Sequence, residues 1–556
     1  MRFAFHLSNT LEPTAILGTE KKKQHFLFCA CESRGSTAPV IFSKSQHMKK
    51  LAYTDLTDSN YVFEALLGYG MFSEKLPPCF TSENIYNYLK SKELDKTKPY
   101  AAVDYWATKN TNSSRLISIP HPKAHWNVCK KIQVNWDQIN KTIGKVEKKH
   151  NYCHVRKIQG KKNIFNMNYS GFDKFNKEEN IIDYLLASEY VVSADISTCF
   201  PSMYSHSLPW AIKGTSWSKL HQCTSQKKNK AKGLHCTKYK DVCPNEKEDL
   251  WCNDLDEAVR NSKSGETNGL LVGPHTSNII SEIILTNVDG CLEESGFKKF
   301  VRHIDDYEYF ASSEEDAKLF LRQLDIELKK FELSINAKKT KIEKTENLSH
   351  VGWITTLTQY YFPNKDEIGF NSVKSYLDYA FALSKQYDDS AVLNYAIKVL
   401  SQKKLSKRAR RLYVKSIMFY SVNNFYLLPL LEEYVFPIAD ETKDLLLEFL
   451  DVLMSRAIST GRGDGIAFSF YFAIKHSVKV DLEIEKQHKI LETNDCIAMT
   501  IAYKYLKESG SVTHLFKDKA NEIMSNSERE QEKNWIFLYE VLPKSSLRLD
   551  EPVFLS

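Results

Sequence analysis

The segment Phe300–Phe310 reads FVRHIDDYEYF and places two adjacent aspartates, Asp305 and Asp306, inside an aromatic-rich stretch. The flanking β-branched and aromatic residues favour a pleated, half-buried strand, whereas the Asp-Asp pair favours a turn. The pattern therefore predicts a β-hairpin with two carboxylates at its tip. Aspartate-rich turns are often only solvated, but carboxylates are also the groups that hold two divalent ions for phosphoryl transfer. A third carboxylate at a matching strand end would favour that chemistry.

Asp195 is the candidate third carboxylate. It follows a short buried-strand pattern, Tyr190–Ala194. One interpretation is a helix or turn cap, which Ser197 and Pro201 support. The alternative is catalytic: if this strand neighbours the hairpin, the three carboxylates meet at one sheet edge and suffice for two Mg²⁺ ions, with Mn²⁺ as a substitute.

The chain that must position these residues changes character along its length. Residues 1–98 lead into a region, 99–362, in which β-branched runs alternate with helical stretches, as in an α+β domain. From 363 to 556 the apolar residues recur at helical spacing and predict an all-α domain, either a solenoid-like stack or an irregular bundle. We expect this helical part to serve in binding, in scaffolding or in forming a homo-oligomer.

Length and composition exclude several classes of protein. A chain of 556 residues is too long for one core and predicts two or three domains. It has no apolar run of about 18 residues, and its N-terminus lacks the apolar core of a signal peptide. No membrane association and a cytoplasmic location are therefore expected. The 12 scattered cysteines favour reduced thiols over a disulfide framework.

Basic residues are clustered more than the net charge of +7 suggests. The clusters are Lys145–Lys162, Lys227–Lys240 and Lys403–Arg411. Such clusters are commonly solvated helix faces, but three of them in a chain with 12% aromatic residues favour a nucleic-acid partner.

Several motifs occur in the order in which reverse transcriptases carry them, between about Met48 and Phe362. The motifs that resemble that family are SSRLISIPHPKAHW (Ser113–Trp126), ADISTCFPSM, GLLVGPHTSNIISEIIL (Gly269–Leu285), RHIDDYEYF, LSINAKKTKI (Leu333–Ile342) and HVGW (His350–Trp353). Together with the helical C-terminal third, they look like the prokaryotic defence-associated reverse transcriptases of the abortive-infection and unknown-group type. The resemblance implies right-hand polymerase fingers and palm, followed by a helical-repeat-like domain, and a role in protection against phage.

The resemblance also implies roles for individual residues. Asp195, Asp305 and Asp306 would be the catalytic, metal-binding carboxylates. Phe200 matches the aromatic that blocks a ribose 2′-hydroxyl and so implies deoxynucleotide substrates. Arg115 matches the fingers arginine that grips the triphosphate, where a guanidinium pairs bidentately with phosphate oxygens.

Further matches concern the leaving group and the template. Lys339 matches the lysine near the leaving pyrophosphate, with Lys338 as its substitute. The residues that would contact template or primer are Gly273, Ser277, His303, Gly352 and Trp353. The sequence departs from the family pattern at His303, where an aromatic is usual, and at Val272, where a glutamine is usual; both put template contact in doubt.

A basic insertion at 219–245 separates two palm motifs and, with the residues just after it, contains Cys223, His235, Cys236, Cys243 and Cys252. A zinc knuckle needs close ligand pairs, which this stretch lacks. We favour a lysine-rich, phosphate-contacting loop over a zinc site.

The sequence thus predicts an RNA-directed DNA polymerase that adds deoxynucleotides by two-metal phosphoryl transfer. Synthesis would be RNA-templated, untemplated or protein-primed, and its partners would be RNA, the DNA product and deoxynucleoside triphosphates. The alternatives are a ribonucleotide polymerase and a catalytically inactive nucleic-acid-binding scaffold.

Overall fold

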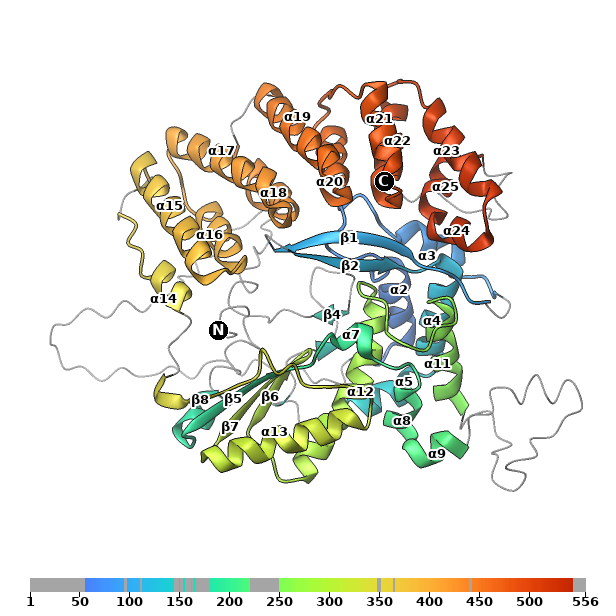
Figure 1. Ribbon diagram of the computed structural model, residues 1–556, viewed down its shortest axis with the longest axis vertical. Coiled ribbons are helices and arrows are strands. Elements are labelled where there is room, and N and C mark those ends of the chain that lie inside the picture. The colour runs from blue at the N-terminus through green and yellow to red at the C-terminus, as the bar shows by residue number, and fades with distance from the viewer. Residues whose placement is uncertain are drawn as a thin grey trace, which may run out of the picture.

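A computed structural model describes residues 56–94, 98–110, 113–144, 150, 154–155, 162, 164–166, 181–220, 250–347, 352–363, 366–439 and 443–543. The chain mixes helices with small sheets (Figure 1). A four-stranded sheet and its helices form one side, a long β-hairpin crosses the middle, and an arc of helices covers the opposite side.

The hairpin joins β1 (Val103–Asn110) to β2 (Ser113–Ile119) in antiparallel register. Its outward and inward residues alternate: on β1, Val103, Tyr105 and Ala107 are buried, whereas Asp104 and Trp106 are exposed. The helices beside it are α2 (Ser59–Tyr69), α3 (Glu83–Leu89), α4 (Pro122–Val134) and α5 (Trp136–Ile143), and a further pair of short strands comprises β3 (His154–Val155) and β4 (Phe165–Asn166).

The four-stranded sheet has the order β6-β7-β5-β8, and all its neighbours are antiparallel. Its strands are β5 (Tyr190–Asp195), β6 (Phe300–His303), β7 (Asp306–Ala311) and β8 (Lys341–Lys344). The long helices α12 (His275–Glu294) and α13 (Glu314–Lys329) accompany it, and Ser313 starts α13 by accepting a hydrogen bond from the Asp316 N–H at 3.1 Å. Shorter helices complete this part: α7 (Cys199–Ser202), α8 (Ser207–Lys213), α9 (Thr215–Leu220) and α11 (Trp251–Asn261).

Side chains of the four-stranded sheet alternate between its two faces. Val192, Ala194, Phe300 and Tyr307 belong to the main hydrophobic core with α12 and α13. The next residues along the strands therefore point to the opposite face, where Val191, Val301 and Phe310 form a separate small cluster.

The helical arc begins after β8 and runs to the end of the described chain. Its helices are α14 (Gly352–Thr358), α15 (Phe370–Tyr387), α16 (Ala391–Ser401), α17 (Lys407–Asn423), α18 (Leu428–Tyr434), α19 (Lys443–Ser459), α20 (Gly463–Lys475), α21 (Ile484–Glu492), α22 (Cys496–Glu508), α23 (His514–Ser525), α24 (Glu528–Lys533) and α25 (Trp535–Val541), with short 3₁₀ turns η2 (Thr345–Asn347), η3 (Phe425–Leu427) and η4 (Phe436–Ile438). The periodic apolar residues predicted to form the inner faces, such as Val373, Leu377 and Leu450, are buried.

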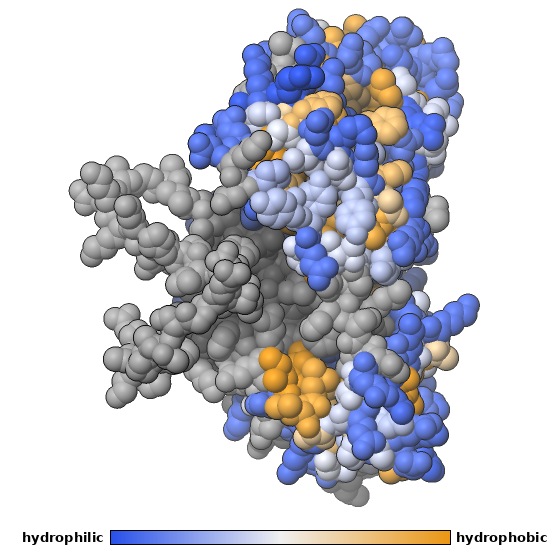
Figure 2. Space-filling model, turned by 90° about the vertical axis from the view of Figure 1, so that its left-hand side faces the viewer, coloured by the Kyte–Doolittle hydropathy of each residue, from blue (hydrophilic) through white to orange (hydrophobic). Residues whose placement is uncertain are grey.

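The prediction of an α+β part followed by helices is confirmed in this coarse form, while the domain boundaries stay predictions. No helix in the described ranges is both long and apolar enough to cross a membrane. Figure 2 views the edge that carries α14, α15 and β8, and apolar side chains gather in its lower half.

A buried carboxyl in the arc makes stability depend on pH. Asp495 starts α22 by accepting a hydrogen bond from the Ala498 N–H at 2.8 Å. Burial raises the pKa of Asp495 to about 6, whereas an unfolded chain titrates near about 4. The folded protein therefore holds this proton more tightly, and stability falls as pH rises from about 4 through about 6.

We predict that Asp495→Asn, which keeps the capping oxygen but cannot ionise, stabilises the protein at pH 7.5. The gain should be roughly 2–3 kcal/mol and should shrink as the pH falls toward 5. Thermal midpoints of both proteins between pH 5 and 8 measure it. Asp518→Asn, at an exposed position of α23, is the control, and a pH-independent difference for Asp495→Asn would contradict the prediction.

Candidate active site

The register of the four-stranded sheet brings the predicted carboxylates together. In the antiparallel pair of β5 and β7, Asp195 lies opposite Asp306. Asp305 lies in the turn between β6 and β7, and its carbonyl accepts a hydrogen bond from the Ile196 N–H at 3.1 Å. The hairpin predicted from the sequence is present, and all three aspartates stand at one edge of the sheet.

Asp195 and Asp305 interact electrostatically. Asp195 is only 6% exposed. Burial raises the pKa of Asp305, and the negative charge of Asp195 raises it further. Arg115 and Lys339 act in the opposite direction because their positive charges favour the ionised carboxylate. Two carboxylates held this close favour a bound cation.

Lys339 supplies the direct counter-charge. Its Nζ lies 2.6 Å from Oδ2 of Asp195, and the lysine side chain as a whole remains more than half exposed. The turn that carries it is anchored at the same place, since Asn336 donates its N–H to the Asp195 carbonyl at 2.7 Å. The lysine stem is flexible, so the same amine can turn toward a phosphate.

A fully buried arginine holds the turn that carries the paired aspartates. Arg302, 0% exposed, places Nε 2.9 Å from Oδ2 of Asp289 and donates through both terminal nitrogens to the Glu282 carboxylate at 3.1 Å. One of these nitrogens also donates to the Ile304 carbonyl at 3.0 Å, and Ile304 has a positive φ of 58°. Tyr307 donates its hydroxyl to Asp289 at 2.9 Å. The network ties α12 to the hairpin on the core side of the sheet.

The face of the sheet opposite α12 carries other polar side chains in addition to the aspartates. His303, Asp306 and Asp195 form one cross-strand row. The next row contains Glu308 opposite Ser193. Glu308 is 6% exposed, and its Oε2 has no hydrogen-bond partner among the described residues. A fourth carboxylate therefore lies one row below the predicted site.

The long hairpin contributes two cations to the same place. Arg115 lies on β2 opposite Ala107. Lys109 falls where the register of β1 and β2 shifts, so it is the extra residue of a β-bulge. Desolvation lowers the pKa of Lys109, the positive charges of Arg115 and Lys339 lower it further, and Asp195 and Asp305 oppose the shift. Both hairpin cations therefore lie within electrostatic range of the carboxylates.

Positive charge continues from the hairpin toward the helical arc. Desolvation lowers the pKa of the Lys75 amine, and the neighbouring charges of Arg115 and of Lys398, on α16, lower it further. Cations from three separate parts of the chain thus face a common region.

Phe200 stands five residues after Asp195 in the short helix α7 and is half-buried. Its carbonyl accepts a hydrogen bond from the Leu270 N–H at 2.8 Å. Gly269 has φ +85°, and a Cβ there would lie 2.7 Å from the carbonyl oxygen of Pro201. Glycine is required at this contact, which fixes α7 beside the segment that leads into α12.

The predicted template-contacting residues of that segment contact β2 instead of open space. Val272 accepts a hydrogen bond from the Ser118 N–H at 2.8 Å. Gly273 has φ +129°, and a Cβ there would lie 3.0 Å from Cγ2 of Ile117. Ser277 is buried in the first turn of α12. The positive φ and the close contact with Ile117 favour glycine at position 273, and contact of Gly273 and Ser277 with the template stays a prediction.

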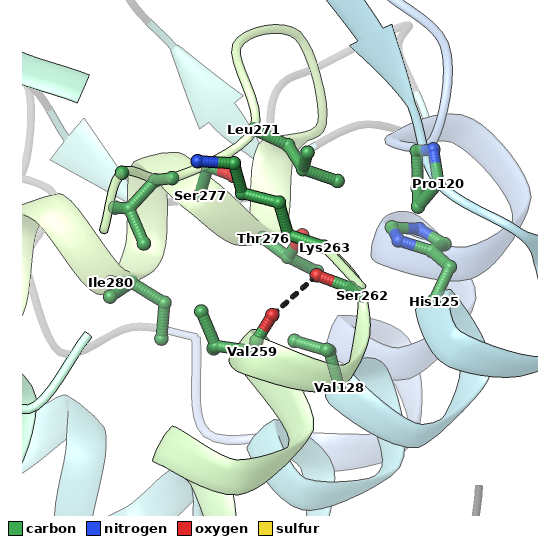
Figure 3. A pocket seen from close by; sticks show the side chains of 12 residues that line it. Pro120, His125, Val128, Val259, Ser262, Lys263, Leu271, Thr276, Ser277 and Ile280 are labelled. Carbon is green, nitrogen blue, oxygen red and sulfur yellow. Dashed lines mark hydrogen bonds between the residues drawn. The ribbon is translucent and has the colours of Figure 1, made fainter. Parts of the chain in front are cut away.

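Ser277 also lines a small cavity between α4, α11 and α12 (Figure 3). In it the Ser262 hydroxyl donates to the Val259 carbonyl at 2.7 Å. None of the three aspartates is among its walls, which comprise Pro120, His125, Val128, Val259, Ser262, Lys263, Gly269, Leu270, Leu271, Thr276, Ser277 and Ile280. The cavity is separate from the carboxylate site.

The structure does not bring Gly352 and Trp353 to the aspartates. Both lie in α14, and Trp353 is 1% exposed. Its Nε1 donates to Oδ2 of Asp389 at 3.1 Å, and its ring meets Tyr395 edge-on with centroids 5.8 Å apart. The indole packs inside the helical arc, and the contact of Gly352 and Trp353 with template or primer stays a prediction.

The carboxylates that the structure brings together agree only in part with the predicted two-metal site. No group of three or more carboxylate, histidine or cysteine side chains converges on a metal position within the ranges that the structure describes. Asp195 and Asp305 nevertheless supply hard oxygen donors in a buried, negatively charged place. Mg²⁺ commonly takes one or two carboxylates together with substrate phosphates, and these residues fit that arrangement.

The basic insertion lies largely outside the described residues, including Cys223, His235, Cys236 and Cys243. Cys252 is described and is buried in α11. Its side chain packs in the hydrophobic core, so it behaves as a small apolar residue there.

We predict that Arg302→Met destabilises the protein strongly. The substitution leaves Glu282 and Asp289 buried without their cation, which should cost about 3–5 kcal/mol and lower the urea midpoint. A variant that also carries Glu282→Gln and Asp289→Asn should regain much of this loss because the stranded charges are removed. An unchanged midpoint for Arg302→Met would contradict the role given to the arginine.

Comparisons with known proteins leave the family of this chain open. No protein-family model matches the chain, and no curated protein matches it. Among solved structures, the apo telomerase of Candida tropicalis is similar over 79% of this chain and 73% of its own, with 12% identical residues and a TM-score of 0.31. A likeness at that TM-score establishes neither a shared fold nor a shared activity.

Proposed function

We propose that the protein is a reverse-transcriptase-like DNA polymerase, which adds deoxynucleotides to a hydroxyl by two-metal phosphoryl transfer. The observation that carries the proposal is the meeting of Asp195, Asp305 and Asp306 at one sheet edge, with Lys339, Arg115 and Lys109 around them. Carboxylates that hold metal ions, beside cations that hold a triphosphate, are what phosphoryl transfer requires.

Each part of this arrangement has a chemical task in the proposal. Asp195 and Asp305 hold Mg²⁺, which when bound polarises the phosphate and stabilises the charge that develops on the attacking and leaving oxygens. Arg115 and Lys109 bind the triphosphate. Lys339 exchanges its contact with Asp195 for one with the leaving pyrophosphate. Phe200 excludes a ribose 2′-hydroxyl.

The motif order supports the reverse-transcriptase assignment over other metal-dependent enzymes, since a nuclease needs carboxylates but neither a fingers hairpin nor a sugar-selecting aromatic. The same resemblance motivates a role in anti-phage defence. The nucleic acid would be an RNA template with its DNA product, or a product made without template, and the positive side chains Lys75, Lys109 and Lys398 offer it phosphate contacts.

We predict that Asp305→Asn lowers deoxynucleotide incorporation at least about a hundredfold, because one of the two charged metal ligands is lost. The purified protein, with any nucleic acid it retains, is supplied with Mg²⁺ and nucleotides, and the products are sequenced. Asp325→Asn, on α13, is the matched control. Equal products from Asp305→Asn and wild type would refute the polymerase, and plaque counts on cells carrying each variant test the defence role.

We predict that Phe200→Ala admits ribonucleotides while deoxynucleotide incorporation continues. Removal of the ring relieves the clash with the 2′-hydroxyl, so the ratio of kcat/KM for deoxy- over ribonucleotides should fall at least about tenfold. Phe419→Ala, at an exposed position of α17, is the control. Unchanged sugar preference in Phe200→Ala would show that this ring does not select the sugar.

A further inference from the structure

The helical arc contacts the β1–β2 hairpin from its middle to its far end (Figure 1). Helices α20, α22 and α24 all contact β1. Two carboxylates of the arc accept backbone N–H groups of this region. Glu532 Oε2 accepts from Ala101 at 2.8 Å, and Asp464 Oδ2 accepts from Thr108 at 2.7 Å. Side chains of the arc therefore satisfy a backbone N–H near the end of β1 and another in the segment just before the strand.

Asp464 makes the more extensive of the two contacts. It lies in the first turn of α20 and is 4% exposed. The same oxygen that accepts from the Thr108 N–H also accepts from the Thr108 hydroxyl, and Oδ1 accepts from the Gly465 N–H at 2.9 Å. Arg462 donates to both side chains, with its nitrogen 3.3 Å from Asp464. Thr108 is thus fixed at its backbone and at its side chain.

Thr108 directly precedes the bulged residue Lys109. The register pairs Thr108 with Ser114 and then resumes at Asn110 with Ser113, so Lys109 is inserted without a partner across the hairpin. A bulge changes the direction of a strand and of the side chain at the extra residue. Lys109 is one of the cations whose charge interacts with the catalytic candidates Asp195 and Asp305.

We infer that Asp464 is a positioning residue for nucleotide binding: by holding Thr108, it fixes the bulge that places the Lys109 ammonium beside the carboxylate site. The helical arc then completes the nucleotide subsite from outside the fingers and palm. This inference rests on the proposed polymerase function, because it assigns Lys109 to the incoming triphosphate.

The first test is steady-state incorporation by the full-length protein. Lys109→Met should raise the KM for deoxynucleotide about tenfold, because a charge-assisted contact to phosphate is lost. Asp464→Asn should raise KM in the same direction with kcat less affected, since an amide cannot accept from Thr108 and Gly465 with both of its atoms. The KM of the double variant should not exceed that of the more affected single variant, because both substitutions act on the same contact, the one between Lys109 and the phosphate.

The matched control is Glu532→Gln. It weakens the other carboxylate contact between the arc and the segment before β1, but it does not touch the bulge, so KM should stay at the wild-type value. Thr108→Val removes only the hydroxyl part of the contact and should give a smaller rise in KM than Asp464→Asn. A wild-type KM in Asp464→Asn, or singles whose effects multiply in the double variant, would overturn the inference.

A second measurement separates this inference from the proposed function. Hydrogen–deuterium exchange should be faster in the peptide containing Thr108 and Lys109 in Asp464→Asn than in wild type, whereas Glu532→Gln should speed exchange only near Ala101. If wild type incorporates no nucleotide, the polymerase is refuted while exchange still decides whether Asp464 holds the bulge. Unchanged exchange at Thr108 in Asp464→Asn would overturn the positioning role directly.

Discussion

The carboxylates of Asp195 and Asp305 are held together with little access to water, and the contacts around the site serve to keep them there. The negative charge of Asp195 raises the cost of ionising Asp305, and neither residue has room to move away, since one ends a paired strand and the other occupies a tight turn. Such a pair stays together only where several contacts of the surrounding structure hold both residues in place. The antiparallel register supplies that restraint from one side, and the buried Arg302 network supplies it from the other.

Positive charge reaches the pair from segments that are distant in the sequence. Lys339 arrives from the turn before β8, and Lys109 and Arg115 arrive from the hairpin. Each side chain remains exposed, and the ion pair of Lys339 with Asp195 can therefore open at modest cost. The Arg302 guanidinium differs because it is enclosed and its donors are fully engaged. It stabilises the arrangement but is unavailable to a substrate.

The sequence predicted those elements whose formation depends on residues close together in the chain. The hairpin at Asp305, the strand that ends at Asp195 and the helices with apolar stripes follow from residue types within a few positions. Arg302 and Glu308 stand in the same quoted segment, yet their burial depends on the face of the sheet, which the alternation along β6 for Arg302 and along β7 for Glu308 could have indicated. Lys109 and Asp464 carry no such signal, because a bulge and a contact across 356 residues are products of tertiary packing. The packing of Trp353 could not be predicted for the same reason: its partner Asp389 belongs to a helix-capping region that only the folded arc brings near.

The return of the arc to the hairpin also limits how the chain can change length. An open stack of helix pairs can gain or lose a pair at little cost because only its neighbours are affected. Here the stack spans a fixed interval, from the exit of the sheet at β8 to the docking of α20 and α24 on β1. One pair more or fewer would move Asp464 away from Thr108, so the number of helices between them is set by the distance that they must bridge.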